Sequence, residues 1–406
     1  MKAFFRLTMW ALVLGATVSL RAAEDEWVRQ AVSPDSSTAL AAQDNLREMG
    51  PEGLQVLMKS YAREIATHGS GSVEDDSWKR IAAALNRVGG QYDEDVSGLY
   101  WYTDFSKAKA AAQAAGKPIL SLRLLGRLDE DLSCANSRFF RTTLYPNAQV
   151  NEILRDKFIL YWESVRPVPV VTIDFGDGRK LVRTITGNSI HYVLDSDGRI
   201  VDALPGLYGA ATFARELQMA AKAATQTGPE EVASYAAYQD STRTRLLLAW
   251  KDDLGGISKS EVKQPQTTEE NALECMTDDK AWQLIANKHE NEVAFDPVSQ
   301  LVMARKFTPA ETAAPLAVSK MFVESPMLRA LRNLQSTVSL DTVRDNYMLR
   351  TKILAYLQSS QVNGLSLAQI NDSIYANIFL TPKDDPWLGL ASNDVFSGID
   401  QNGEKR

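Results

Sequence analysis

The chain has 406 residues and a formal net charge of −7, with 44 Lys and Arg residues against 51 Asp and Glu residues. It carries no basic stripe, so the electrostatic footprint of a nucleic-acid-binding protein is absent and we expect no nucleic-acid partner. The length is sufficient for two or three domains, each with a substantial hydrophobic core.

The first residues have the pattern of an export signal. Lys2 and Arg6 flank the start of an apolar run over residues 7–20, which is too short to span a membrane comfortably. We expect cleavage after Ala22 or Ala23, and an uncleaved N-terminal anchor is the alternative. No later segment reaches membrane-spanning length. The sequence therefore predicts an exported protein, most simply periplasmic, without a transmembrane span in the mature chain.

The region after this signal peptide (residues 1–23) is predicted to be helical as far as residue 98. Three helical patterns cover residues 39–49, 52–65 and 78–88, and glycines follow the first and the last. The turn at Gly50-Pro51 is similar to that of a HEAT-type helical pair, although one pair does not establish a repeat array. We therefore predict a small HEAT-like helical cap over residues 24–98.

From residue 99 the pattern changes to short strands that alternate with helices. The late strands are joined by turns typical of hairpins, including an Asp-Gly turn at Asp197-Gly198. Helices between the early strands and an antiparallel hairpin near the end predict an α/β sandwich over residues 99–225. The expected elements are a helix at 106–115, strands at 117–124 and 158–162, hairpins within 166–185 and 190–203, and a helix at 213–224.

A cysteine lies at the predicted junction between the strand at 117–124 and the next helix, in the stretch Cys134-Ala135-Asn136-Ser137. The first N–H groups of a helix and the positive end of its dipole favour a thiolate at such a junction. Ser137 stands where a second cysteine would be needed for a local disulfide. Two-electron dithiol chemistry is therefore excluded at this motif.

The stretches Gly116–Leu120 (GKPIL) and Tyr192–Arg199, together with the placement of Cys134, resemble the thioredoxin-like superfamily over residues 101–222. The resemblance implies a thioredoxin-like sandwich with its redox cysteine at position 134. It covers under a third of the chain.

The chain departs from the superfamily pattern at three positions. The tryptophan usual before the cysteine is Ser133, the resolving cysteine is Ser137, and the loop residue where the family keeps a cis-proline beside the cysteine is Ser189. Because that proline shapes substrate access in thioredoxins, these departures argue against disulfide exchange.

The chain has a second cysteine, Cys275. Three interpretations of Cys134 therefore stay open: an inert buried thiol, a reactive monothiol, or one half of a long-range disulfide with Cys275. The three histidines, His68, His191 and His289, lack metal-ligand spacing, so we predict neither a zinc site nor a cofactor. For His191 we favour a buried histidine with satisfied hydrogen bonds over a base for Cys134.

Residues 226–406 are predicted to be mostly helical, with a polar linker at 251–270 and no catalytic motif. Near the end, the apolar stretch around Trp387 suggests a tail that docks back on the body of the protein. Helical patterns occur at residues 272–289, 309–323, 327–334, 341–357 and 367–379.

Two functions of different classes fit the sequence. The first is an exported thioredoxin-like protein with a single-cysteine site, active in weak thiol redox chemistry or thiol capture, with Cys134, Ser137 and Ser189 as its site and thiol-containing proteins or small thiols as partners. The second is a non-catalytic periplasmic scaffold built on a degenerate thioredoxin-like fold. A hydrolase in the C-terminal third has no nucleophile-plus-base signature to support it. The sequence indicates no oligomeric state.

Overall fold

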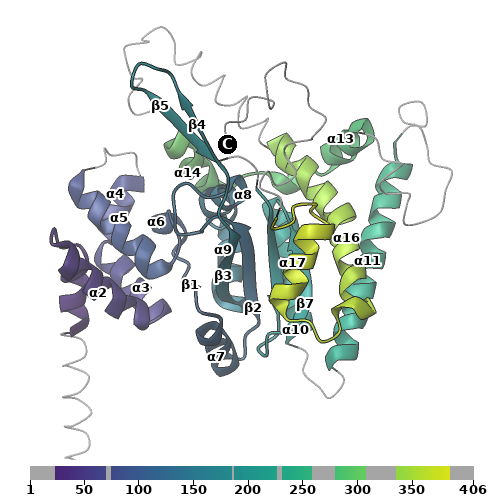
Figure 1. Cartoon of the computed structure of the whole chain (residues 1–406), viewed down its shortest axis with the longest axis horizontal. Helices are drawn as coiled ribbons and strands as arrows, with labels where there is room; N and C mark the ends of the chain where they lie inside the picture. Colours follow the sequence, from purple (N-terminus) through teal and green to yellow (C-terminus); the bar gives the residue numbers. More distant parts are fainter. Residues whose placement is uncertain are drawn as a thin grey trace, which may run out of the picture.

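The computed structural model describes residues 23–69, 75–184, 187–225, 231–257, 279–307 and 335–384. Within these ranges the protein is mixed α/β and mostly helical, with a central sheet and helical regions on both sides of it in the sequence (Figure 1). The predicted combination of an α/β region with N-terminal and C-terminal helical regions is confirmed.

The N-terminal helices form a unit with its own core. Leu46, Leu57 and Leu85 are among its fully buried side chains, and Trp78 covers them from α5. The side chain of Asp35 caps α2 by accepting from the N–H of Thr38. After a helix over residues 23–31, the unit comprises α2 (Ser36–Glu48), α3 (Pro51–Ser60), α4 (Ala62–Gly69), α5 (Asp76–Gly89) and α6 (Glu94–Ser97).

Five strands in the described ranges form one mixed sheet in the order β1-β3-β2-β6-β7. The strands β1, β3 and β2 are parallel to one another, whereas β6 and β7 run antiparallel to their neighbours. Every residue of β2 and β6 is buried, as expected for central strands that are covered on both faces. The strands are β1 (Trp101–Tyr102), β2 (Ile119–Leu125), β3 (Ile159–Arg166), β6 (Ser189–Leu194) and β7 (Ile200–Pro205).

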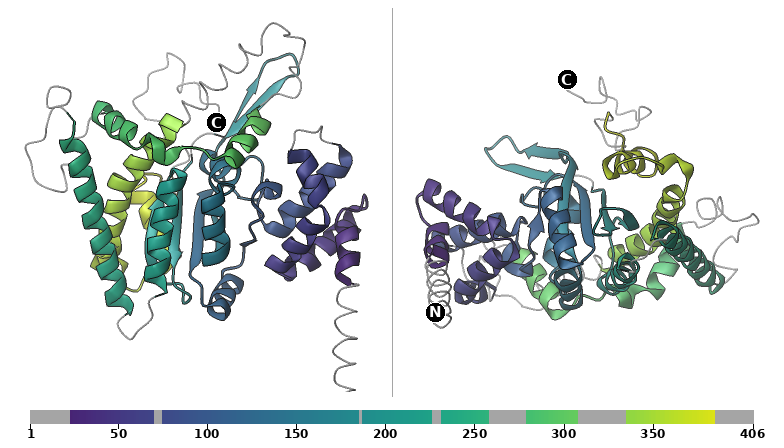
Figure 2. Two further views of the ribbon diagram at one scale, coloured as in Figure 1. Left: turned by 180° about the vertical axis from the view of Figure 1, so that it is seen from behind. Right: turned by 90° about the horizontal axis from the view of Figure 1, so that it is seen from below.

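Helices cover both faces of this sheet. Figure 2, left, which views the protein from behind, shows α9 and α10 side by side on the near face of the sheet, and Figure 1 shows α17 on the opposite face. Phe213 of α10 packs against the ring of His191, while Asn371 of α17 accepts a 3.1 Å hydrogen bond from Tyr192, the next residue of β6. The helices that belong to the α/β region are α7 (Phe105–Ala115), α8 (Ala135–Phe139), the π-helical turn η1 (Phe140–Leu144), α9 (Ala148–Lys157) and α10 (Ala210–Ala224).

The C-terminal helices share the core of the sheet rather than forming a separate unit. Ile353 and Ile374 are fully buried in the same apolar cluster as the strands. These elements are α11 (Glu231–Gly255), α13 (Asp279–Lys288), η2 (Glu290–Val293), α14 (Pro297–Phe307), a helix over residues 335–344 that continues into the π-helical turn η3 (Asp345–Leu349), α16 (Arg350–Leu357), η4 (Ser360–Val362) and α17 (Leu367–Asn377).

The connection between β3 and β6 is a separate two-stranded hairpin, β4 (Val170–Asp174) and β5 (Lys180–Thr184). It extends away from the body of the protein (Figure 1). Every residue of β4 is exposed, in contrast to the buried strands of the main sheet.

The helix α11 occupies the start of the predicted polar linker, because it continues through residues 251–255 and ends at Gly255. The reason is tertiary packing: Trp250 and Leu254 lie one turn apart and are buried against Trp282 of α13. Several predicted features lie outside the described residues: the linker from residue 258 onward, Cys275, the helical patterns at 309–323 and 327–334, and the Trp387 tail.

Among the described residues, no helix is both long and apolar enough to cross a bilayer.

Candidate functional site

Cys134 lies at the start of α8, where the chain turns from the loop after β2 into a helix. Its backbone is extended, with φ −62° and ψ 160°, and its Sγ accepts a 3.4 Å hydrogen bond from the N–H of Ser137. The side chain is 0% exposed and belongs to the main hydrophobic core. The thiol therefore points into the protein, not into a groove.

A buried arginine holds the loop before Cys134 in place. Arg141 donates from Nη1 to the hydroxyl of Ser133 at 2.9 Å and from Nε to Asp93 at 3.0 Å. It also donates to the backbone carbonyls of Glu130 and Asp131, at 2.6 and 2.9 Å. These bonds connect the cysteine loop to the N-terminal unit and fix the backbone that covers the sulfur.

The two serine candidates are both occupied by other contacts. The hydroxyl of Ser137 bonds to that of Ser133 and donates to the carbonyl of Cys134 at 3.2 Å. The hydroxyl of Ser189, at the start of β6, accepts a 2.9 Å bond from the amide of Asn136. The fold thus brings residues 134, 137 and 189 to one place, where the hydroxyls of Ser137 and Ser189 are bonded to Ser133 and Asn136, respectively.

Burial raises the pKa of the Cys134 thiol, and this effect outweighs the opposing hydrogen bond from the N–H of Ser137. The helix that begins here continues into the π-helical turn η1, but the sulfur at its start is removed from water. The expectation that this helix terminus favours a thiolate is therefore reversed by burial.

His191 lies on β6 with its ring between Phe140 and Phe213. The Tyr145 hydroxyl and Nε2 of His191 are hydrogen-bonded at 2.8 Å. Burial lowers the pKa of His191 to about 3, so the ring is neutral at ordinary pH. The burial of His191 agrees with the predicted buried histidine, but the expectation of satisfied hydrogen bonds is met only at Nε2, because Nδ1 is buried without a hydrogen-bond partner among the described residues. The hydrogen bond of the ring that the described part of the chain shows is to Tyr145, not to Cys134.

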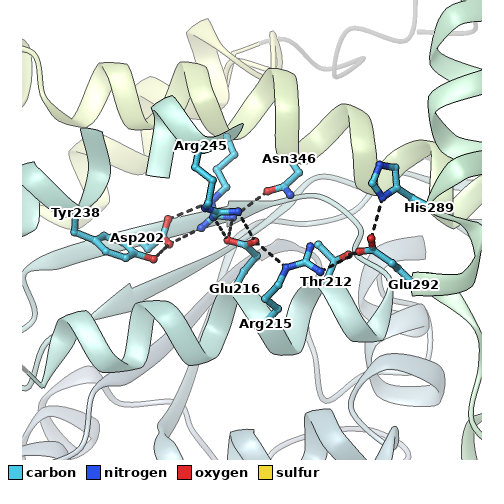
Figure 3. A network of polar contacts seen from close by, with 10 residues as sticks. Asp202, Thr212, Arg215, Glu216, Tyr238, Arg245, His289, Glu292 and Asn346 are labelled. Carbon is cyan, nitrogen blue, oxygen red and sulfur yellow. Dashed lines mark hydrogen bonds and ion pairs between the residues drawn. The ribbon is translucent and has the colours of Figure 1, made fainter. Parts of the chain in front are cut away.

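A second buried polar cluster lies where the C-terminal helices meet the sheet (Figure 3). Arg350 of α16 pairs with Asp202 of β7 at 2.6 Å and with Glu216 of α10 at 2.7 Å, and all three side chains are 0% exposed. Glu216 also accepts from Arg245 of α11, and the hydroxyl of Tyr238 donates to Asp202. Arg350 thereby joins α16 to β7 and α10, and the two carboxylates join α11 to them.

The charges of this cluster stabilise one another. Burial would raise the pKa of Glu216, but Arg350 and Arg245 outweigh it and hold that pKa below its usual value. Burial would lower the pKa of Arg350, and the carboxylates of Asp202 and Glu216 reverse this effect. Each charged group has a partner, so the cluster is a structural clamp rather than a reactive site.

An arm of the same polar region runs to His289, between α13 and η2 (Figure 3). Its Nε2 lies 2.7 Å from Asp253 and its Nδ1 2.9 Å from Glu292. Hydrogen bonds to these two carboxylates raise the pKa of His289 to about 9. Glu292 in turn accepts from Thr212 and Arg215 of α10, which connects the arm to that helix.

A groove of about 390 Å³ lies between the N-terminal unit and the edge of the sheet. Its floor is largely apolar, and Lys117 and Arg155 lie at its rim, where Arg155 pairs with Asp156 at 3.0 Å. No His, Cys or Ser lines this groove, so its side chains suit binding better than acid–base or nucleophilic catalysis. The groove is lined by side chains that include Pro51, Leu54, Tyr100, Tyr102, Phe158 and Leu160.

Sequence reasoning did not identify Arg141, Asn136 or the Arg350 cluster. The available signal was the occurrence of charged residues within apolar patterns, such as Asp202 inside the strand Ile200–Pro205. Across the described ranges, no group of three or more His, Cys, Asp and Glu side chains is arranged to hold a metal ion. Comparisons of the chain with protein-family models, with curated proteins and with solved structures found no match.

Proposed function

We propose that this protein is an exported interaction protein built on a thioredoxin-like domain whose cysteine site is closed. The observation that carries this proposal is the burial of Cys134, which is 0% exposed. A thiol must reach its target as a thiolate in order to attack a disulfide and release the other sulfur as a thiolate. Burial keeps the Cys134 sulfur from contact with a target molecule, and it disfavours ionisation of the thiol.

The arrangement of the α/β region supports the thioredoxin-like part of the proposal. Cys134 follows the central parallel strand β2 and caps the next helix, which is the position that the resemblance implies. The antiparallel pair β6–β7 comes late in the chain, as in the predicted sandwich.

The interaction role is supported by what surrounds this region. The N-terminal helical unit meets the sheet edge at a groove lined by apolar and aromatic side chains with a few charged ones, and the C-terminal helices share the core of the sheet. Binding to a partner is the activity that such a surface offers, because a groove with an apolar floor and a few polar groups is typical of ligand sites.

The test is the reactivity of Cys134 toward iodoacetamide, read by peptide mapping in the folded chain and in denaturant. We expect the folded chain to react at least about 100-fold more slowly, since reaction requires local opening. A Cys134→Ala variant should keep the function of the protein in its own compartment at an unchanged protein level. A folded-state rate close to that of the unfolded chain, with an apparent thiol pKa below about 8.5, would instead support the monothiol function.

A further inference from the structure

The β4–β5 hairpin carries an apolar face that the body of the protein leaves uncovered. Val171 and Ile173 alternate along β4, and Phe175 continues the alternation one residue beyond its end, so the pattern places the three side chains on one face. They are 39%, 47% and 55% exposed. An isolated two-stranded hairpin is at best marginally stable in water, and an exposed apolar strand is prone to association. This face therefore needs a covering segment.

The described part of the chain ends at the base of the same hairpin. Arg166, the last residue of β3, donates to the carbonyl of Pro382 at 2.8 Å and to that of Thr381 at 3.1 Å. Asn188, which follows the hairpin, donates to the Thr381 hydroxyl at 3.2 Å. Contacts from both sides of the hairpin thus hold Thr381 and Pro382, and the described chain ends two residues later, at Asp384.

The segment that follows, residues 385–406, lies outside the described part of the chain. Its sequence contains large apolar residues near its start. Trp387, Leu388 and Leu390 come within six residues of Asp384. An extended chain of 22 residues reaches up to roughly 70 Å, whereas the five residues of β4 span only about 17 Å. Reach does not limit contact between this segment and the hairpin.

We propose that residues 386–396 bind the apolar face of the β4–β5 hairpin in the same molecule. The tether favours this occupant over a second copy or a partner protein, because a short linker gives an effective concentration in the millimolar range. The apolar side chains around Trp387 cover Val171, Ile173 and Phe175, which removes them from water and supports the hairpin. This inference is independent of the state of Cys134.

A cross-linking experiment on the full chain tests the proposal. One variant combines Ile173→Cys with Leu388→Cys, and a short bismaleimide then joins cysteines that lie close together. The matched control combines Leu388→Cys with Leu40→Cys, because Leu40 of α2 is 45% exposed and Ile173 is 47% exposed. We expect an intramolecular cross-link between positions 173 and 388, at a yield that does not change with protein concentration.

Three results would overturn the proposal: no cross-link between positions 173 and 388, equal yields for the test and control pairs, or a cross-link that joins two chains. The last result would identify a second copy as the occupant. Peptide mapping reads the engineered positions separately from Cys134 and Cys275.

A second measurement addresses the cover directly. The maleimide reaction at Ile173→Cys is compared between the full chain, a chain that ends at Asp384, and a full chain with Leu388→Asp. We expect both changes to speed the reaction by about fivefold or more. In the full chain, position 173 reacts only while the C-terminal segment is detached from the hairpin, and both changes remove or weaken that binding. Equal rates in all three proteins, each with an unchanged circular dichroism spectrum, would show that residues 385–406 do not cover this face.

Discussion

Arg350 and Asp202 form an ion pair from which solvent is excluded on both sides. Nη2 of Arg350 lies 2.6 Å from Oδ2 of Asp202, and neither side chain is exposed. The two residues come from α16 and β7, 148 positions apart in the sequence. Removing two charges from water costs free energy, and the additional bonds to Glu216 and Asn346 offset that cost.

Replacing Arg350 is expected to weaken the whole fold. Arg350→Met leaves the carboxylates of Asp202 and Glu216 buried without their main partner, and such a loss typically costs about 3–5 kcal/mol in the free energy of unfolding. Urea unfolding followed by circular dichroism measures this quantity. The control is Lys383→Met, which removes an exposed pair with Asp372 and should change stability by at most about 1 kcal/mol.

A double variant distinguishes two causes of the expected loss of stability: the unpaired carboxylates and the lost packing of the Arg350 side chain. If the cost of Arg350→Met arises from uncompensated charge, the additional change Asp202→Asn should restore part of the stability. Equal stabilities of the Arg350→Met and Lys383→Met variants would contradict the assignment of Arg350 as the clamp.

Gly206 joins the end of β7 to η3 through a contact that admits no side chain. Its φ is +71°, and a Cβ there would lie 2.0 Å from Oδ2 of Asp345, which also accepts from the N–H of Leu207 at 2.8 Å. We expect Gly206→Ala to destabilise the protein by more than the roughly 1 kcal/mol that positive φ alone costs. The control is Gly116→Ala, with φ +62° and open space at the Cβ position. Thermal unfolding of the two variants measures the difference, and equal losses would show that the contact with Asp345 can relax.

His289 should make stability depend on pH in the alkaline range. Its hydrogen bond to Asp253, followed by that to Glu292, raises its folded-state pKa to about 9, above the value of 6.5 expected in the unfolded chain. A raised pKa means that the stabilisation is fully present below pH 6.5 and is lost as the pH rises through 9. The unfolding free energies of the parent protein and of His289→Gln should therefore converge between pH 6.5 and 9.5. A difference that stays constant over this range would exclude a protonated His289 in the folded protein.

His191 should behave in the opposite way. Burial lowers its pKa to about 3, so the folded protein keeps the ring neutral while the unfolded chain takes up a proton below pH 6.5. Stability is lost as the pH falls from 6.5 toward 3 for this reason. NMR of the imidazole groups should show no titration of His191 between pH 5 and 8, with its signals assigned by their absence from a His191→Gln variant. A midpoint near pH 6.5 would mean that the ring reaches solvent.

Much of the secondary structure could be predicted from the sequence because its signals are local. Gly116 ends α7 in the left-handed conformation that glycine adopts without strain, and the side chain of Asp104 caps the start of that helix. Alternation and turn residues likewise predicted the β4–β5 hairpin, and Cys134 was placed correctly at a strand-to-helix junction. In each case a few neighbouring residues carry the physical cause.

The sequence by itself determined which segments form helices and which form strands. It also excluded a local disulfide at the Cys134 motif, since Ser137 supplies no second sulfur. Only the tertiary structure decided the state of that thiol. Arg141 and Asn136 fix the backbone around Cys134, and burial then outweighs the effect of the helix terminus. The ion pair between Arg350 and Asp202 likewise joins side chains that lie far apart in the sequence. Burial determines how much this pair stabilises the folded protein. The spacing of apolar residues along one segment carries no information about contacts between segments that are far apart in the sequence.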